Sequence, residues 1–172
     1  MKKGIYNKLI FSAVLVFVSV LFAQELTKVF TASNGALRVT TPADWEEIVL
    51  NDAADIQAGN LQKEQYFILI SEAKADLYGW NLKKHSYVTL GNLVAGLNDP
   101  QIKGPIEMEI NEQPAIQYEI EGSTSGLRIV YLHTTVESDS AYNQLLAWTL
   151  RSKYSENKSL LKDVINTFTQ TR

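Results

Sequence analysis

The segment IEMEINEQPAIQYEIEG, at residues 106–122, limits the fold of this chain more than any other feature. Apolar and polar residues alternate on both sides of a short polar stretch, a pattern typical of two half-buried strands joined as a hairpin. We expect one dry and one wet face. The dry face would carry Ile106, Met108, Ile110, Ile116, Tyr118 and Ile120, and the wet face Glu107, Glu109, Gln117, Glu119 and Glu121.

Two further strands, at residues 127–137 and 142–150, are predicted to extend this hairpin as an antiparallel meander. Pairing Ile120 with Leu127 places Glu119 beside Arg128, so that opposite charges meet. A slip of one residue would mix the two faces, and the first register is therefore the expected one.

Residues 66–70 (YFILI) are apolar without alternation, which indicates a central strand covered on both faces. Helices must then do the covering, and the sequence offers two. Residues 82–97 carry an apolar stripe and end at Asn98-Asp99-Pro100. Residues 156–168 carry a second stripe, with Ser155 placed to cap the helix. The stripes are Leu90, Leu93, Val94 and Leu97 in the first helix, and Leu160, Leu161, Val164, Ile165 and Phe168 in the second.

The N-terminal part of the predicted sheet begins with strands at residues 29–31 and 36–41, which flank a Ser-Asn-Gly turn. Pro42 removes a backbone donor and ends the second strand. Residues 46–50 and 54–58 are weaker strand candidates. Trp45 is expected to plug the end of the sheet under a helix, with its N–H bonded to a backbone carbonyl. The alternative is that Trp45 stacks on a ligand.

These elements predict an α+β fold, in which an antiparallel sheet of about six to eight strands is sandwiched by helices. Residues 24–172 supply 149 residues, which suits one domain.

Residues 1–23 resemble a secretory signal peptide. Lys2, Lys3 and Lys8 precede an apolar stretch over residues 9–22, and Ala23 follows it. The stretch is shorter than the roughly 20 residues that span a bilayer. We therefore expect a periplasmic or extracellular protein with no transmembrane segment after cleavage. The alternative is an uncleaved anchor, because Leu21 is larger than the residue usual at its position.

Composition excludes two classes of function. The chain has no cysteine, so it has no thiol chemistry. Without the three lysines of the signal, 13 basic residues stand against 19 acidic ones, a net charge near −6. Such a surface repels phosphate backbones, and nucleic acid is not expected as a partner.

The order of motifs resembles the PsbP-like superfamily, which groups PsbP, DcrB and the Ran-binding Mog protein. The likeness begins with a Pro-x-x-Trp element (Pro42 and Trp45). It continues with a hairpin that carries Gly104-Pro105, Asn111 and Pro114-Ala115, and it ends with an amphipathic helix that closes on Phe168. It covers about residues 28–169 and is closer to the bacterial envelope branch. The resemblance implies an antiparallel sheet between helices and a non-enzymatic accessory or binding role. It carries over no calcium, chloride or manganese site.

The sequence contains no nucleophile elbow, phosphate-binding glycine loop or zinc-binding His-Glu-x-x-His pair. Only His85 and His133 can act as imidazole bases or ligands. Glu137 shares a strand face with His133 but lies about 13 Å away, too far to share one ion. Both histidines are therefore interpreted as structural, and neither an enzyme nor a cofactor is predicted.

The glutamates of the hairpin form a candidate acidic patch: Glu107, Glu109, Glu119 and Glu121 are expected to point the same way. Glu107 would then lie opposite Glu119, where like charges need compensation. A divalent cation, a basic partner surface, or Arg128 and Lys103 of the same chain would each provide it.

Aromatic residues offer a second candidate surface. Tyr78, Gly79 and Trp80 lie in a predicted loop, where their rings are hard to bury, and form the expected interaction surface. Packing between helix and sheet accounts for the other aromatic residues, although some of them would suit a ligand cleft.

The sequence thus predicts an exported, non-enzymatic accessory or binding protein of the cell envelope that docks on another envelope protein. The alternative is a periplasmic protein that binds a small ligand or a divalent cation in the helix–sheet cleft or on the acidic hairpin.

Overall fold

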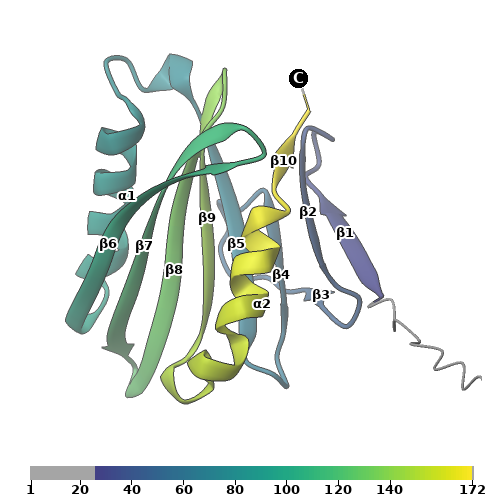
Figure 1. Cartoon of the computed structure of the whole chain (residues 1–172), viewed down its shortest axis with the longest axis vertical. Coiled ribbons are helices and arrows are strands. Elements are labelled where there is room, and N and C mark those ends of the chain that lie inside the picture. The colour runs from purple at the N-terminus through teal and green to yellow at the C-terminus, as the bar shows by residue number, and fades with distance from the viewer. Residues whose placement is uncertain (1–25, 172) are drawn as a thin grey trace, which may run out of the picture.

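A seven-stranded antiparallel sheet forms the centre of the molecule (Figure 1). The computed structural model describes residues 26–171. The strand order across the sheet is β3-β4-β5-β9-β8-β7-β6. The strands are β3 (Glu46–Glu47), β4 (Ile56–Asn60), β5 (Gln65–Ala73), β6 (Asn98–Ile110), β7 (Gln113–Thr124), β8 (Leu127–Glu137) and β9 (Ala141–Leu150).

Two helices cover opposite faces of this sheet, which confirms the predicted α+β fold. Helix α1 (Leu82–Ala95) packs over β7, β8 and β9. Helix α2 (Tyr154–Asn166) packs over β8 and β9 on the other face, where Leu161 and Ile165 join the main core (Figure 1). We call these two sides the α1 face and the α2 face.

Strand β5 has the buried, central position that its unbroken apolar run predicts. Phe67 and Leu69 are fully buried on the α2 face, and Ile68 is buried on the α1 face. Because the side chains of a strand alternate between faces, a run that is apolar at every position needs cover on both.

A second, three-stranded sheet closes the end of the α2 face. It consists of β1 (Thr27–Thr31), β2 (Leu37–Pro42) and β10 (Thr169–Gln170), in the order β1-β2-β10. The expected N-terminal hairpin is present, with Gly35 at φ +73° in its turn, and Pro42 is the last residue of β2. Phe168 joins α2 to β10 and is fully buried.

Trp45 lies at the centre of the core and is fully buried. Its Nε1 donates to Oε1 of Gln65 at 3.0 Å, so the partner is a side chain and not the expected backbone carbonyl. Gln65 Nε2 in turn donates to Oδ1 of Asn157 on α2 at 2.8 Å, and Asn157 Nδ2 donates to Thr149 Oγ1 at 2.9 Å. This chain of amides joins β5, β9 and α2.

The hairpin at residues 106–122 has a different register from the one expected. A two-residue turn, with Asn111 at φ +48° and Glu112 at φ +67°, sets Ile110 opposite Gln113 and Glu107 opposite Ile116. Residues opposite each other share a face. Ile106, Met108 and Ile110 of β6 therefore lie on the α2 face, whereas Ile116, Tyr118 and Ile120 of β7 lie on the α1 face. The prediction of one dry face is wrong.

The β7–β8 register also differs. Thr124 pairs with Leu127 across a turn of Ser125 and Gly126, and Ile120 pairs with Tyr131 instead of Leu127. Both turn residues have positive φ, so a two-residue turn closes the hairpin near its tip. The shift is four residues, an even number, and the predicted faces of these two strands are preserved.

Several element boundaries differ as well. Only residues 46–47 of the expected 46–50 segment form a strand, and β6 begins at Asn98 in place of a loop. Helix α2 begins at Tyr154, so Ser155 lies within it, and the N-cap residue Lys153 makes no capping hydrogen bond with its side chain. Helix α1 is capped by Asn81, whose Oδ1 accepts from the Lys84 amide at 2.8 Å.

The predicted signal segment lies outside the described residues. Within residues 26–171, no helix has both the length and the apolar content to cross a bilayer.

Candidate binding groove

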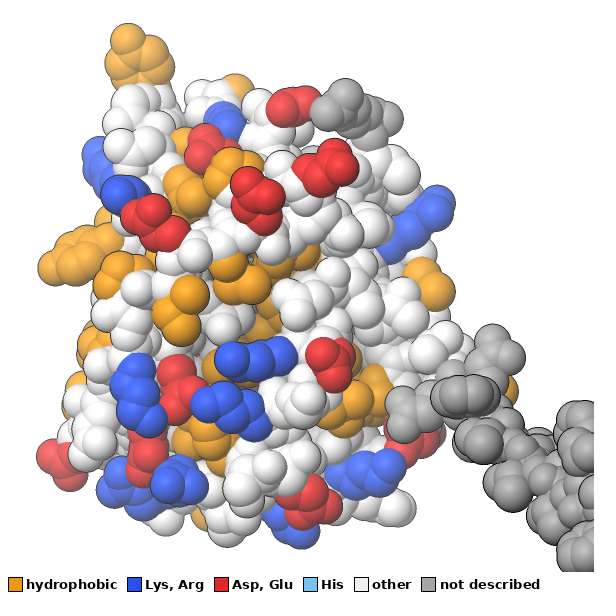
Figure 2. Space-filling model, in the orientation of Figure 1, with side chains coloured by type: hydrophobic (Ala, Val, Ile, Leu, Met, Phe, Trp, Pro, Cys, Tyr) orange, Lys and Arg blue, Asp and Glu red, His pale blue; other side chains and the backbone are white. Residues whose placement is uncertain are grey.

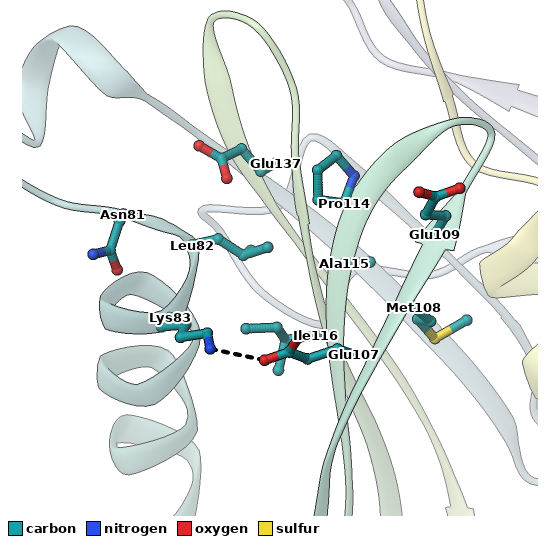
Figure 3. Close-up of a pocket in the computed structure, with 10 residues that line it drawn as sticks. All are labelled: Asn81, Leu82, Lys83, Glu107, Met108, Glu109, Pro114, Ala115, Ile116 and Glu137. Carbon is teal, nitrogen blue, oxygen red and sulfur yellow. Dashed lines mark ion pairs between the residues drawn. The ribbon is translucent and has the colours of Figure 1, made fainter.

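A groove runs between the first turns of α1 and the hairpin of β6 and β7. Its larger part, a cavity of about 560 Å³, lies beside the N-terminal end of α1 (Figure 3). Leu82 and Ile116 form its apolar floor, and Lys83, Glu107, Glu109 and Glu137 surround them. The Asn81 cap starts α1 at this point, which places Leu82 and Lys83 against the strands.

A second cavity of about 400 Å³ continues the groove along α1. It shares Lys83, Glu107 and Ile116 with the first, and it adds Tyr87 and Tyr118. The Tyr87 side chain is 72% exposed. We call the two cavities together the α1–β6 groove.

One ion pair crosses the groove: Lys83 Nζ lies 2.8 Å from Glu107 Oε1 (Figure 3). The hydrogen bond and the attraction between the charges raise the pKa of Lys83 and lower the pKa of Glu107. Both side chains are more than two-thirds exposed, at 76% and 67%. Exposed pairs of this kind contribute little to stability, so a partner can replace this one.

The other carboxylates of the rim differ in their partners. Glu137 pairs with Lys74 at 2.8 Å. Glu109 makes no ion pair with any residue of the described part of the chain. The groove therefore combines an apolar floor with a charged rim, an arrangement typical of protein–protein interfaces.

The segment at residues 78–80 leads directly into the groove. Tyr78 is 98% exposed, and Gly79 takes φ +75°, a conformation that glycine adopts easily. Trp80 is only half-buried, and its ring lies edge-on to His85 at 6.0 Å, while its carbonyl accepts from the Tyr142 hydroxyl at 3.1 Å. Tyr78 therefore has the more exposed of the two rings, and the role of this segment as an interaction surface stays a prediction.

The four glutamates of the predicted acidic patch do not share a face. Glu107 and Glu109 lie on the α1 face, opposite Ile116 and Pro114, whereas Glu119 and Glu121 lie on the α2 face. The prediction was wrong because the two-residue turn places the glutamates of β6 on the same face as the isoleucines of β7, and not on the same face as its glutamates. Glu119 lies opposite Lys103 and not Glu107.

Glu119 and Glu121 are compensated within the chain. Glu119 accepts from Lys103 and Lys158, each at 2.9 Å, and from the Tyr154 hydroxyl. Burial alone would raise the pKa of Glu119, but these hydrogen bonds lower it to about 2. Arg128 and Arg151 bind Glu121 at 2.6 Å and 2.9 Å and lower its pKa. Lys103 and Arg128 therefore neutralise this pair, as one of the three alternatives predicted.

Both histidines lie in the layer between α1 and the sheet, and both are fully buried. His85 Nε2 lies 2.8 Å from Oε2 of Glu72, and His133 Nε2 lies 3.0 Å from Thr89 Oγ1. Burial, together with the nearby His85, lowers the pKa of His133 to about 4. The Thr89–His133 pair has the groups of a nucleophile and a base, but both side chains are buried under α1, away from solvent. Within residues 26–171, no cluster of three or more side chains is placed to bind a metal ion.

No protein-family model matches the sequence, and no curated protein matches it in sequence. Solved structures do match. The cyanobacterial PsbP (CyanoP) of Synechocystis sp. PCC 6803 superimposes with a TM-score of 0.61 at 11% identity, covering 92% of this chain and 98% of that one. This chain has a PsbP/Mog1-like fold.

Two more structures share this PsbP/Mog1-like fold. LpqN of Mycobacterium tuberculosis, described as involved in cell envelope biogenesis, gives a TM-score of 0.60 at 13% identity over 86% of this chain and 91% of its own. The Ran-binding protein Mog1p of Saccharomyces cerevisiae gives a TM-score of 0.55 at 10% identity, over 85% of this chain and 96% of its own. At these identities the likeness shows the fold, and the resemblance predicted from the sequence is confirmed at that level.

Sequence reasoning raised a helix–sheet cleft as an alternative, with aromatic residues such as Tyr87 as possible lining, but did not locate the α1–β6 groove. Lys83 and Glu137 received no role in it, because the expected register kept Glu107 away from α1. The two-residue turn at Asn111 and Glu112 was the signal that could have revealed it.

Proposed function

We propose that this chain is an exported accessory protein of the cell envelope that acts by docking on another protein and not by catalysis. The observation that carries the proposal is the α1–β6 groove, with its apolar floor of Leu82 and Ile116 and its charged, exposed rim. The likeness to LpqN, with its described part in cell envelope biogenesis, supports an envelope role. The signal-like pattern of residues 1–23 supports export.

Binding suits this site better than chemistry does. The groove exposes lysine, carboxylate, tyrosine and aliphatic side chains, and the one hydroxyl–imidazole pair described above, Thr89 with His133, is buried beneath α1. A nucleophile and its base must both reach a substrate, and these two do not.

Site-specific photo-crosslinking in intact cells tests the proposal. A photo-reactive amino acid at Tyr87, in the groove, should form an adduct with one protein of the envelope. The matched control is the same substitution at Leu61, an exposed residue in the β4–β5 turn, far from the groove. Lys83→Glu should change the yield of the Tyr87 adduct, because it reverses one charge of the rim and removes the partner of Glu107.

Three results would contradict the proposal. These are an adduct that forms equally from Leu61, an adduct unaffected by Lys83→Glu, or no protein adduct together with a co-purified small molecule in native mass spectrometry. The last result would support carriage of a small ligand, since the larger cavity falls within the roughly 300–1,000 Å³ typical of ligand pockets.

A further inference from the structure

Strand β6 forms an open edge of the seven-stranded sheet. β7 is its only neighbour in the described part of the chain, and all its residues except Met108 and Ile110 are exposed. Helix α1 packs mainly over β7, β8 and β9, and it reaches β6 through the exposed Lys83–Glu107 pair while most residues of β6 stay exposed. The opposite edge of the sheet is different, because β3 has only two residues. An uncovered edge presents backbone N–H and C=O groups that an added strand can pair with.

Only the last part of β6 has a regular edge. The first part is interrupted by register shifts between Asn98 and Gln101 and between Lys103 and Ile106, and by Pro100 and Pro105, which have no N–H. Such features block the pairing of edges. Residues 106–110 pair with β7 without interruption.

The two-residue turn decides which backbone groups of this stretch point outward. In such a hairpin the residues that flank the turn form a hydrogen-bonded pair, here Ile110 with Gln113, and every second residue repeats the pattern. Ile110, Met108 and Ile106 therefore direct their N–H and C=O groups toward β7. Glu107 and Glu109 direct theirs outward, and no described segment pairs with them.

The side chains beside this edge define the chemistry of an added strand. On the α1 face, Glu107 and Glu109 lie at the edge, with Glu112 and Glu137 nearby, against Lys83 and Lys74. Figure 2 shows acidic side chains gathered over this end of the molecule, beside exposed apolar ones. On the α2 face, the edge carries Ile106, which is 56% exposed, and the half-buried Met108.

We propose that β6 accepts an extended segment of the docking partner in which basic residues alternate with apolar ones. This proposal rests on the proposed docking function. The Glu107 and Glu109 backbones hydrogen-bond the added strand, its Lys or Arg side chains lie beside the two carboxylates, and its apolar side chains lie beside Ile106 and Met108. A second copy of this chain fits poorly, because antiparallel pairing of two β6 edges brings the glutamates of both copies together.

The test uses the purified chain, labelled with ¹⁵N, and three synthetic hexapeptides with blocked ends. The first alternates valine and lysine, the second has the same composition in a non-alternating order, and the third alternates valine and glutamate. Only the first should bind, and it should shift the amide resonances of Glu107 and Glu109 while those of β3 and β4 stay in place.

Two variants separate backbone from charge. Glu109→Gln removes one charge and should weaken binding about twofold to threefold. Glu109→Pro removes the charge and also the outward backbone N–H, and an edge strand tolerates a proline at such a position. This variant should bind about tenfold or more weakly than Glu109→Gln. Retained helix and sheet content by circular dichroism and unchanged unfolding midpoints keep the comparison valid.

Four outcomes would overturn the inference. They are equal binding of the first two peptides, binding of the glutamate peptide, equal affinities of Glu109→Pro and Glu109→Gln, and self-association of the chain that Glu109→Pro abolishes. A crosslink from Tyr87 that persists in Glu109→Pro would leave the docking function standing and remove only the strand addition.

Discussion

The hydroxyl of Thr89 on α1 lies 3.0 Å from Nε2 of His133 on β8 and connects helix to sheet. The same hydroxyl donates to the His85 carbonyl at 3.0 Å, so it accepts the bond from His133. This network assigns the proton of His133 to Nε2, and the lowered pKa of His133, about 4, keeps the ring neutral at neutral pH. His85 Nδ1, His133 Nδ1, Ser86 Oγ and Thr135 Oγ1 in this layer have no hydrogen-bond partner. A charge added here would have few groups to stabilise it.

Protonation of His133 should destabilise the fold. Its pKa falls from 6.5 when unfolded to about 4 in the folded chain, so the unfolded state binds the proton more tightly. The contribution to stability is complete above the unfolded pKa and is lost as the pH falls toward 4. Between about pH 7.5 and pH 5 the loss from this group should be about 2 kcal/mol.

Urea unfolding across that pH range measures the loss in the natural chain and in His133→Gln. The variant should be less stable at neutral pH but should lose less stability on acidification. The neighbouring titratable groups are His85 and Glu72, whose side chains lie 2.8 Å apart, so His85→Gln serves as the second comparison. Parallel pH profiles for the natural chain and His133→Gln would contradict the assignment.

Two substitutions of Trp45 should lower the stability of the fold by different amounts. Trp45→Ala removes a fully buried ring and should cost about 3–5 kcal/mol of unfolding free energy. Trp45→Phe keeps most of the ring but leaves Gln65 Oε1 without its donor, which should cost about 1–3 kcal/mol. Denaturant unfolding followed by circular dichroism checks both values. An unchanged midpoint for Trp45→Ala would favour the ligand-stacking alternative.

The sequence predicted the layers of this fold well, because burial determines them. Residues 66–70 needed cover on both faces, and the structure has a helix on each face of the sheet, with Phe67 and Leu69 buried on one side and Ile68 on the other. The stripe of α1 was predicted less well: Leu90 is buried, but Leu93 and Val94 are only partly so, and the fully buried neighbours include His85 and Ser86. Apolar periodicity does not detect a helix face that packs through polar residues against a histidine of the sheet.

The position of the candidate groove was not predicted, because it depends on the length of one turn. Alternation along β6 and along β7 is the same whether two or three residues join them, but an added residue reverses the face of the second strand. The prediction placed the isoleucines of both strands on one face because it assumed that the other face is exposed to solvent. Here both faces are covered, and Asn111 and Glu112 form the whole turn. That turn brings Glu107 to α1.

Glu119 should stabilise the α2 face through its bonds to Tyr154 and Lys158 of α2. Glu119→Gln keeps the size of the side chain but removes its charge, and should cost about 1–2 kcal/mol. Glu109→Gln, which alters a carboxylate without an ion pair among residues 26–171, should leave stability unchanged. Thermal unfolding at neutral pH compares the two variants.

The pH dependence gives an independent check on Glu119. Its folded pKa of about 2 lies below the ordinary value of 4.5, so its contribution is present above 4.5 and is lost as the pH falls toward 2. The natural chain should lose more stability than Glu119→Gln over that range. Equal acid sensitivity of the two would show that the bonds to Lys103 and Lys158 do not hold the carboxylate ionised.

Glycine 59 offers a test of the packing between β4 and β5. A Cβ added to Gly59 would lie 2.4 Å from the Gln65 backbone oxygen, and this oxygen cannot move without displacing β5. Gly59→Ala should therefore cost about 1–3 kcal/mol. Gly91→Ala is the matched control, because a Cβ at Gly91 meets open space on the exposed side of α1 and should stabilise the helix by about 1 kcal/mol. Urea unfolding should move the two midpoints in opposite directions. If Gly59→Ala is as stable as the natural chain, then β4 does not lie as close to β5 as the structure places it, and the end of the sheet near Trp45 is looser than described.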